Sequence, residues 1–415
     1  MLIPYFRLSR TGFPLILPVL LVLLLSVPVQ SENSPFAPEP PVIQAPSAIL
    51  WDLTGSTLLY EKEADREIPP ASMTKLMSLH LAFRAVEEGR LALDQLIPVS
   101  RAASFKSSPP HSSLMFLEEG QKVTLLDLMI GLALPSGNDA GIALAEAVSG
   151  GLVPFVEQMN LEARRLGLEK TRFVDSFGYS ENNMTTPREF AEFCRVYIEE
   201  HPLALKELHS LRQYTYPREE NMVPPGVSTY GPITQYNHNN LIGRLDGVDG
   251  LKTGFIDESG YNLAVTAERN GRRLLAVLMG GPEILNSDGN LVRALDAASL
   301  LTYGFTAFTD LRPEPPVLPE IRIWKGRKKT LPLSAGEIPL LTLDRVRAAE
   351  LRWEILLDRN LTAPVAKGTP AGTLSCLDSR GNLLFSTPLV TREEAPRGPW
   401  WRRLADSLRR FFLRG

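Results

Sequence analysis

Ser72 and Lys75 are the residues of this 415-residue chain whose types and spacing most clearly suggest chemistry. They lie three apart at the start of a helix-like segment that follows Pro69 and Pro70, and residues three apart on a helix share a face. A serine hydroxyl is a poor nucleophile at neutral pH and needs a neighbouring base. A lysine can be that base if burial or a nearby cation lowers its pKa. The pair therefore predicts an activated serine, with the helix N-terminus favouring a developing oxyanion.

Two further short motifs carry polar groups that such a serine could use. Ser136-Gly137-Asn138 offers a hydroxyl to relay a proton and an amide to orient the lysine or a substrate carbonyl. Lys252-Thr253-Gly254 offers a cation and a hydroxyl for a carboxylate, and a glycine that lets a ligand backbone approach. Each motif alone is as well explained by an ordinary polar turn. Chance is a poor explanation for all three in this order.

The set resembles the penicillin-recognising serine enzymes, whose motifs are S-x-x-K, S-x-N and K-T-G. The flanks resemble more narrowly the low-molecular-mass penicillin-binding proteins that act as D-alanyl-D-alanine carboxypeptidases, serine peptidase family S11. This similarity is carried by PASMTKLM at 70–77, SGNDA at 136–140, DGLKTG at 249–254 and SGYNL at 259–263. It extends from about residue 48 to residue 281.

The resemblance implies a reaction for the first two motifs. Ser72, deprotonated by Lys75, would attack the carbonyl between the two terminal D-alanines of a peptidoglycan stem pentapeptide. Ser136 would relay the proton to the leaving D-alanine. Water would then hydrolyse the acyl-enzyme, whereas β-lactams would acylate the same serine and leave slowly. No cofactor is implied.

The resemblance also implies how the substrate is held. Asn138 would orient it, and Lys252 with Thr253 and Gly254 would hold the terminal carboxylate. The backbone N–H groups of the serine and of Phe255 would form the oxyanion hole. Many relatives carry His where Phe255 stands. The backbone N–H does not depend on the side chain, so we expect its role to be kept. The pH dependence and the rate of β-lactam release are expected to differ.

Two alternative functions remain open. A D,D-endopeptidase would cut peptidoglycan cross-links with the same residues, and a non-catalytic wall-binding relative would keep only the fold. A class A β-lactamase fits less well, because Gly137 stands where Ser-Asp-Asn is preferred and no E-x-x-L-N segment follows.

Other kinds of site lack support in the sequence. The five histidines form no H-E-x-x-H pattern and the two cysteines form no C-x-x-C pair, so we expect no metal centre. Cys194 and Cys376 leave one disulfide possible and exclude a disulfide framework.

The elements that must position these motifs alternate between strand and helix patterns. A strand is expected at 48–53 and helices at 72–88, at 124–134 after Thr124 and from Pro187 onward. Asn270-Gly271 between two apolar runs predicts a hairpin. We therefore expect an α/β (α+β) catalytic domain with a mainly antiparallel sheet over 47–310, and the resemblance implies the serine β-lactamase/penicillin-binding-protein-like fold.

Proline clusters mark the expected domain boundaries. Residues 32–46 are a Pro-rich linker, and a second cluster begins at Pro313. After it, short alternating stretches broken by glycines predict a small β-rich domain over 311–395.

Both chain ends are basic and apolar. Residues 1–31 combine two arginines with a 17-residue uncharged run, which is typical of a signal peptide or, if uncleaved, of an anchor. Residues 397–415 place Trp, Leu and Phe on one side of an expected helix and arginines mostly on the other. Such a helix is expected to lie on an anionic membrane surface, with a solvated tail or a partner-binding helix as alternatives.

The net charge of −3 conceals this division. The leader carries +2, the tail +5 and the body −10. An acidic body argues against nucleic acid as a partner, because phosphate would be repelled. We expect an exported enzyme at the outer, periplasmic face of the cytoplasmic membrane, held peripherally by its tail.

Overall fold

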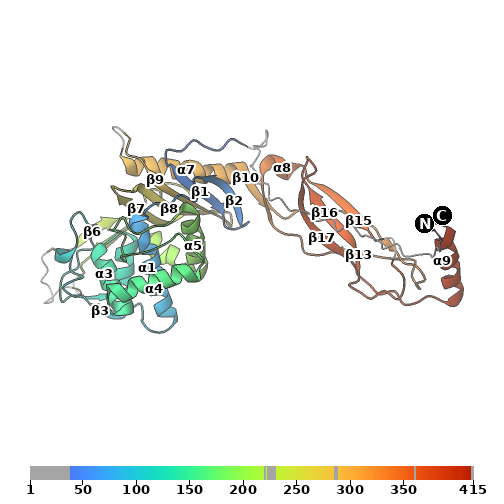
Figure 1. Ribbon diagram of the computed structural model, residues 1–415, viewed down its shortest axis with the longest axis horizontal. Coiled ribbons are helices and arrows are strands. Elements are labelled where there is room, and N and C mark those ends of the chain that lie inside the picture. Colours follow the sequence, from blue (N-terminus) through green and yellow to red (C-terminus); the bar gives the residue numbers. More distant parts are fainter. Residues whose placement is uncertain (1–37, 219–220, 222–229, 285–287, 359–360, 413–415) are drawn as a thin grey trace, which may run out of the picture. The chain divides into compact units, whose positions relative to one another are not determined.

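The computed structural model describes residues 38–218, 221, 230–284, 288–358 and 361–412, so the expected signal peptide and the first part of the linker lie outside the described residues. Its largest sheet has five antiparallel strands in the order β2-β1-β9-β8-β7 (Figure 1). The strands are β1 Ser47–Asp52, β2 Thr57–Lys62, β7 Val248–Ile256, β8 Gly260–Arg269 and β9 Arg272–Gly281. The mainly antiparallel sheet expected from the sequence is confirmed, and β7 lies at its edge.

Helices cover both faces of this sheet: α7 packs against one face and α5 against the other, where α1, α3 and α4 also lie (Figure 1). The helices of this region are α1 Lys75–Glu87, α2 Leu125–Ala133, α3 Asn138–Ser149, α4 Leu152–Arg165, α5 Pro187–Glu200, α6 Pro202–Ala204 and α7 Gly289–Ala307. A short 3-10 turn, Ala71–Thr74, directly precedes α1. Two apolar cores result because alternate side chains of a strand point to opposite faces. In β1, Ile49 joins the core under α1–α5, whereas Leu50 joins the core under α7.

Local sequence signals fix several of these boundaries. Thr124 accepts a hydrogen bond from the backbone N–H of Asp127, and Thr186 accepts one from that of Glu189, so the helix starts predicted after Thr124 and at Pro187 are both confirmed. Asn270 and Gly271 have φ values of 52° and 76°, as the tight turn between β8 and β9 requires. The predicted hairpin is therefore confirmed.

The chain beyond α7 is rich in short strands. A four-stranded sheet in the order β13-β17-β16-β15 encloses a separate apolar core that includes Ile323, Leu374 and Leu389. The strands here are β10 Phe308–Leu311, β11 Ile321–Arg322, β12 Thr330–Leu331, β13 Leu333–Ala335, β14 Leu341–Asp344, β15 Arg352–Leu357, β16 Pro370–Leu377 and β17 Leu383–Thr391. One short helix, α8 Arg345–Ala349, interrupts the expected all-β pattern, and β10 pairs with β14 across the expected boundary at residue 311.

Four short strands form two small antiparallel sheets, β3 Leu96–Pro98 with β4 Lys122–Thr124 and β5 Gln213–Tyr216 with β6 Ile233–Tyr236. A π-helical turn, Leu205–His209, precedes β5. Cys194 and Cys376 are both free and buried, so the disulfide that the sequence left open is not formed.

The expected tail is a helix, α9 Trp400–Phe412, which begins three residues later than predicted. Arg397 still pairs with Gly326, and the N–H of Gly398 donates to the carbonyl of Lys325, so these residues belong to the preceding β-rich region. Among the helices that the structure describes, none is by itself both long and apolar enough to cross a bilayer; α3 and α4 meet that criterion only as a pair bent by 81°.

Candidate active site

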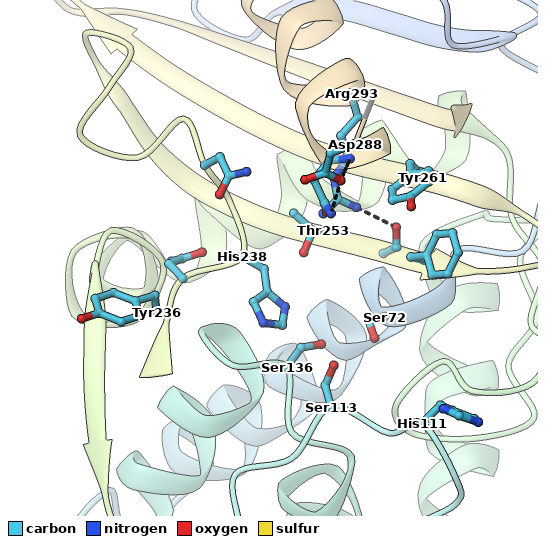
Figure 2. Close-up of a pocket in the computed structure, with 15 residues that line it drawn as sticks. Ser72, His111, Ser113, Ser136, Tyr236, His238, Thr253, Tyr261, Asp288 and Arg293 are labelled. Carbon is cyan, nitrogen blue, oxygen red and sulfur yellow. Dashed lines mark hydrogen bonds between the residues drawn. The ribbon is translucent and has the colours of Figure 1, made fainter. Parts of the chain in front are cut away.

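The three motifs meet at one cavity of about 540 Å³ beside the edge strand β7 (Figure 2). Ser72 comes from the turn before α1, Ser136 from the loop between α2 and α3, and Thr253 from β7. Figure 2 shows the two serines on one side of the cavity and Thr253 on the other. Ser72 and Thr253 are 181 residues apart, so only packing of the helices against the sheet brings them together.

Lys75 is held by three oxygen atoms. Its Nζ lies 3.0 Å from Ser72 Oγ, 2.8 Å from Asn138 Oδ1 and 2.6 Å from the carbonyl oxygen of Phe177. A neutral amine has two hydrogens and one lone pair. If the hydrogens go to the amide and carbonyl oxygens, which can only accept, the lone pair is left for the serine hydroxyl. The arrangement suits a lysine that removes a proton from Ser72.

The surroundings of Lys75 favour this neutral form. The side chain is buried, and burial lowers the pKa of its amine to about 7, with Asp175 and Asp139 partly opposing the shift. The carboxylate of Asp175 accepts hydrogen bonds from the N–H groups of Phe177 and Gly178, which fixes the carbonyl that Lys75 contacts. A lysine with a pKa near the working pH can both take and return a proton.

The two serine-bearing loops have unusual backbone conformations. Ser136 has a φ of 61°, and Ala71, which precedes Ser72, has a φ of 50°. Residues other than glycine adopt such values at a cost that surrounding structure must overcome, and they cluster at functional sites. Ser136 Oγ is buried and has no hydrogen-bond partner among the described residues, so its hydroxyl is available to a ligand.

Strand β7 brings the third motif to the cavity that Ser72 also lines. Lys252 is buried, and burial, with Lys75 and Arg293 nearby, lowers the pKa of its amine well below the usual value. An anionic group in the cavity would restore the charged form. A Cβ on Gly254 would lie 2.5 Å from the carbonyl oxygen of Pro70, so the backbone that approaches this glycine is the chain's own. The close packing of β7 against Pro70 therefore requires a glycine here, in addition to the expected approach of a ligand.

Sequence reasoning missed most of the other residues that line the cavity, including Arg293 and His238. Arg293 on α7 is buried and donates to the carbonyl oxygens of Gly254 and Asn262, at 3.0 and 3.2 Å. His238 also lines the cavity, and its ring points towards Ser136 (Figure 2). Burial and the nearby Lys252 lower the pKa of His238 to about 4, so its imidazole is neutral at pH 7. Neither residue belongs to a short motif, and no signal in the sequence marks them.

Comparison with known families agrees with this geometry. The family model for D-alanyl-D-alanine carboxypeptidase, peptidase family S11, matches residues 34–283. The model for the penicillin-binding protein 5 C-terminal domain matches residues 316–397. The chain is 34% identical over 395 residues to the D-alanyl-D-alanine carboxypeptidase DacD of Escherichia coli K12, an alignment that covers 93% of this chain and 96% of DacD.

Solved structures are similar as well. Penicillin-binding protein 6B from Escherichia coli aligns with a TM-score of 0.68 and 31% identity, over 87% of this chain and 99% of that protein. Penicillin-binding protein D2 from Listeria monocytogenes, solved in its ampicillin-bound form, aligns with a TM-score of 0.54 and 27% identity, over 65% of this chain and 100% of that protein.

Proposed function

This chain belongs to the D-alanyl-D-alanine carboxypeptidase family of serine peptidases, and from that premise we propose that Ser72 is its nucleophile and Lys75 its general base. The protein is a serine-type, penicillin-binding D-Ala-D-Ala carboxypeptidase that removes the terminal D-alanine of peptidoglycan stem peptides. The observation that carries the assignment is the 3.0 Å separation of Lys75 Nζ and Ser72 Oγ, with the other two contacts of Nζ made to oxygen acceptors.

Acylation begins when Ser72 Oγ adds to the carbonyl carbon between the two D-alanines and its proton passes to Lys75 Nζ. The backbone N–H groups of Ser72 and Phe255 stabilise the negative oxygen that forms. The C–N bond then breaks: Ser136 gives its hydroxyl proton to the nitrogen of the departing D-alanine and takes up the proton that Lys75 removed from Ser72, so that Lys75 is neutral again. The buried, unpartnered hydroxyl of Ser136 supports this relay.

The terminal carboxylate of the substrate binds at β7. The ammonium of Lys252 and the hydroxyl of Thr253 hold it, while Asn138 orients the substrate amide and keeps Lys75 in place. Arg293 adds a second positive charge at this side of the cavity. A carboxylate there offsets the repulsion among the cations, so binding selects a peptide with a free C-terminus.

In deacylation, water adds to the ester carbonyl carbon and gives a proton to the neutral Lys75, which passes it to Ser72 Oγ as the bond between the acyl carbon and Oγ breaks. β-Lactams acylate the same residue and leave slowly. The ampicillin-bound Listeria relative supports this partner for the present chain.

Variants of Ser72 and Lys75 test the assignment. Ser72→Ala is expected to abolish both D-alanine release from a pentapeptide stem and labelling by a fluorescent penicillin. Lys75→Ala is expected to lower labelling by at least about 10²-fold, since general-base catalysis contributes roughly 10²–10⁴. Circular dichroism checks that both variants remain folded. Retained labelling of Ser72→Ala at another residue would refute the nucleophile, and faster release from cross-linked dimers than from pentapeptide would favour an endopeptidase.

The division of the chain and its location remain part of the proposal. We infer a signal peptide at 1–31, a linker at 32–46, a catalytic domain at 47–310, a β-rich domain at 311–395 and an anchoring tail at 397–415. The charged, apolar leader and the substrate's position in the wall support export to the outer face of the cytoplasmic membrane. The exposed apolar side of α9 supports a peripheral membrane contact.

A further inference from the structure

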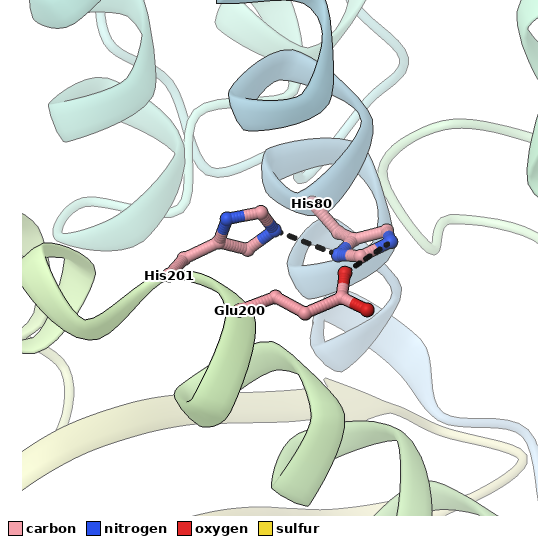
Figure 3. Close-up of side chains that lie close together, drawn as sticks. All are labelled: His80, Glu200 and His201. Atoms are coloured by element: carbon pink, nitrogen blue, oxygen red, sulfur yellow. Dashed lines mark hydrogen bonds and ion pairs between the residues drawn. The ribbon is translucent and has the colours of Figure 1, made fainter. Parts of the chain in front are cut away.

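A cluster of histidine and glutamate side chains lies where α1 meets the end of α5 (Figure 3). His80 on α1 and His201 at the end of α5 are buried, whereas Glu200 is exposed. His80 Nδ1 lies 2.8 Å from His201 Nε2, and His80 Nε2 lies 3.9 Å from a carboxylate oxygen of Glu200. One potential ligand atom from each of the three residues lies within 4.8 Å of the other two.

The outer nitrogen of each imidazole already contacts a carboxylate. His80 Nε2 lies 2.8 Å from Glu162 Oε1, and His201 Nδ1 lies 2.9 Å from Glu87 Oε1. An ionised carboxylate can only accept a hydrogen bond, so each neutral imidazole must carry its single hydrogen on the outer nitrogen and donate it to the carboxylate. The inner nitrogens, Nδ1 of His80 and Nε2 of His201, then face each other as two lone pairs. Because lone pairs 2.8 Å apart repel each other, a positive charge has to lie between them.

Either a proton or a metal ion could supply that charge, and the surroundings favour the metal. Histidines that bind a metal through one nitrogen usually donate the other N–H to a carboxylate, and both histidines here have such a partner. A shared proton needs only the two nitrogens, whereas Glu200 adds a third potential ligand. Two histidines and one carboxylate are a common ligand set for zinc.

We propose that His80 Nδ1, His201 Nε2 and the Glu200 carboxylate bind a divalent transition-metal ion, for which zinc is the best fit. Tetrahedral ligands about 2.0–2.1 Å from zinc lie about 3.4 Å apart, so the two inner nitrogens, now 2.8 Å apart, must move about 0.6 Å farther from each other. Arg165 Nη2 lies 3.8 Å from the Glu200 carboxylate and would have to release it. The ion would link α1, the helix that carries Lys75, to α5, and its fourth position would hold water.

Zinc binding to the full-length chain, solubilised in detergent and freed of metal by a chelator, tests the proposal. We expect one Zn²⁺ per chain by isothermal titration calorimetry and a rise in the melting temperature on adding Zn²⁺. Glu200→Gln should lower the affinity at least tenfold while the protein stays folded, because this side chain is exposed. Glu199→Gln is the matched control, since Glu199 is the preceding exposed glutamate and pairs with Arg195 instead.

The outer carboxylate provides a second test that leaves all three ligands in place. Glu87→Gln should weaken zinc binding by about 10- to 100-fold, as loss of such a partner typically does. Absence of zinc binding to the wild-type chain would overturn the proposal. Binding that Glu200→Gln leaves unchanged would also overturn it, because the metal would then be held elsewhere.

Discussion

As the proposed general base, Lys75 has to be a neutral amine before it can take the proton of Ser72, and burial favours that neutral form. The pKa of Lys75 is lowered to about 7 because the side chain is removed from water, even though Asp175 and Asp139 lie close enough to oppose the shift. The same residue in water would be almost entirely charged at neutral pH. The chemistry of the site therefore depends on how completely α1, α3 and the Phe177 loop enclose one nitrogen atom.

This environment predicts a pH dependence for acylation. Below pH 7 Lys75 is protonated and cannot accept the serine proton, so the acylation rate constant should fall roughly tenfold per pH unit. It should level off above about pH 8, where the amine is neutral. Stopped-flow measurements with a fluorescent penicillin from pH 5 to 9 would check the apparent pKa near 7. A rate constant that does not change between pH 5 and 7 would contradict Lys75 as the base.

The proposed zinc site likewise depends on single residues, because it requires the hydrogens of His80 and His201 to lie on their outer ring nitrogens. His80 and His201 meet across 121 residues of sequence, and each is oriented by a carboxylate on its outer nitrogen. No metal centre was expected from the sequence, since no ligand motif is present. A pair of distant histidines is not visible until α1 and α5 are placed side by side.

At the scale of elements, the edge strand β7 is held against the turn that carries Ser72. Asn262 on the neighbouring strand β8 donates to the carbonyl of Pro69, and Arg293 on α7 donates to the carbonyl of Gly254. These contacts hold β7, the strand proposed to bind the substrate carboxylate, at a set distance from Ser72, the proposed nucleophile. Effective catalysis requires this distance to be kept within a few tenths of an ångström.

Gly254→Ala should therefore separate β7 from the nucleophile. The new methyl carbon would lie 2.5 Å from the carbonyl oxygen of Pro70, a backbone atom that cannot rotate away. We expect a loss of about 1–3 kcal/mol in stability, as for overpacked sites. Acylation by penicillin should slow at least about tenfold, given the steep dependence on geometry.

Gly231→Ala is the control for this change, because nothing lies within 4 Å of a Cβ at Gly231. Thermal melts and acylation rates of the two variants would be measured side by side. If Gly254→Ala were acylated at the wild-type rate, the position of β7 relative to Ser72 would not matter for acylation, and the proposed role of this packing would be wrong.

At the scale of the whole molecule, helix α9 is amphipathic and its polar side faces the protein. Asp406 is buried and accepts a hydrogen bond from the N–H of Lys325, and Arg410 donates to Thr362. The apolar residues on the other side are exposed: Trp400, Trp401, Leu404, Leu408, Phe411 and Phe412. Exposed aromatic residues beside a row of arginines favour an anionic lipid surface.

Replacing two of these residues should weaken membrane binding and leave the enzyme active. Trp401→Ser combined with Leu408→Ser removes about 3 kcal/mol or more of apolar burial, at roughly 1.5–3 kcal/mol per side chain. Sedimentation with phosphatidylglycerol-containing vesicles should show at least tenfold weaker binding. Penicillin labelling should be unchanged, because neither residue lines the cavity.

Leu356→Ser is the matched control, since Leu356 is an exposed apolar residue on β15. Vesicle binding of the double variant at the wild-type level would contradict the role of this face. A truncation that tests the same point should begin at Trp400 and not at residue 397, because Arg397 pairs with Gly326.

The sequence alone determined what is local in this protein. The three-residue spacing of Ser72 and Lys75 places the lysine beside the serine. Thr124 and Thr186 each cap the first turn of the helix that follows them. Asn270-Gly271 forms the turn of a hairpin. Each depends on backbone geometry over a few residues, which residue type controls directly. The motif residues and the antiparallel sheet were therefore predictable.

Only the tertiary structure decided what depends on long-range packing. It brought Arg293 and His238 into the cavity, enclosed Lys75 so that its pKa is lowered to about 7, and set Gly254 against the backbone of Pro70. None of these follows from spacing along the chain, because each requires the faces of distant elements to meet in one register. Burial is a property of the folded whole, and here burial turns a lysine into a base.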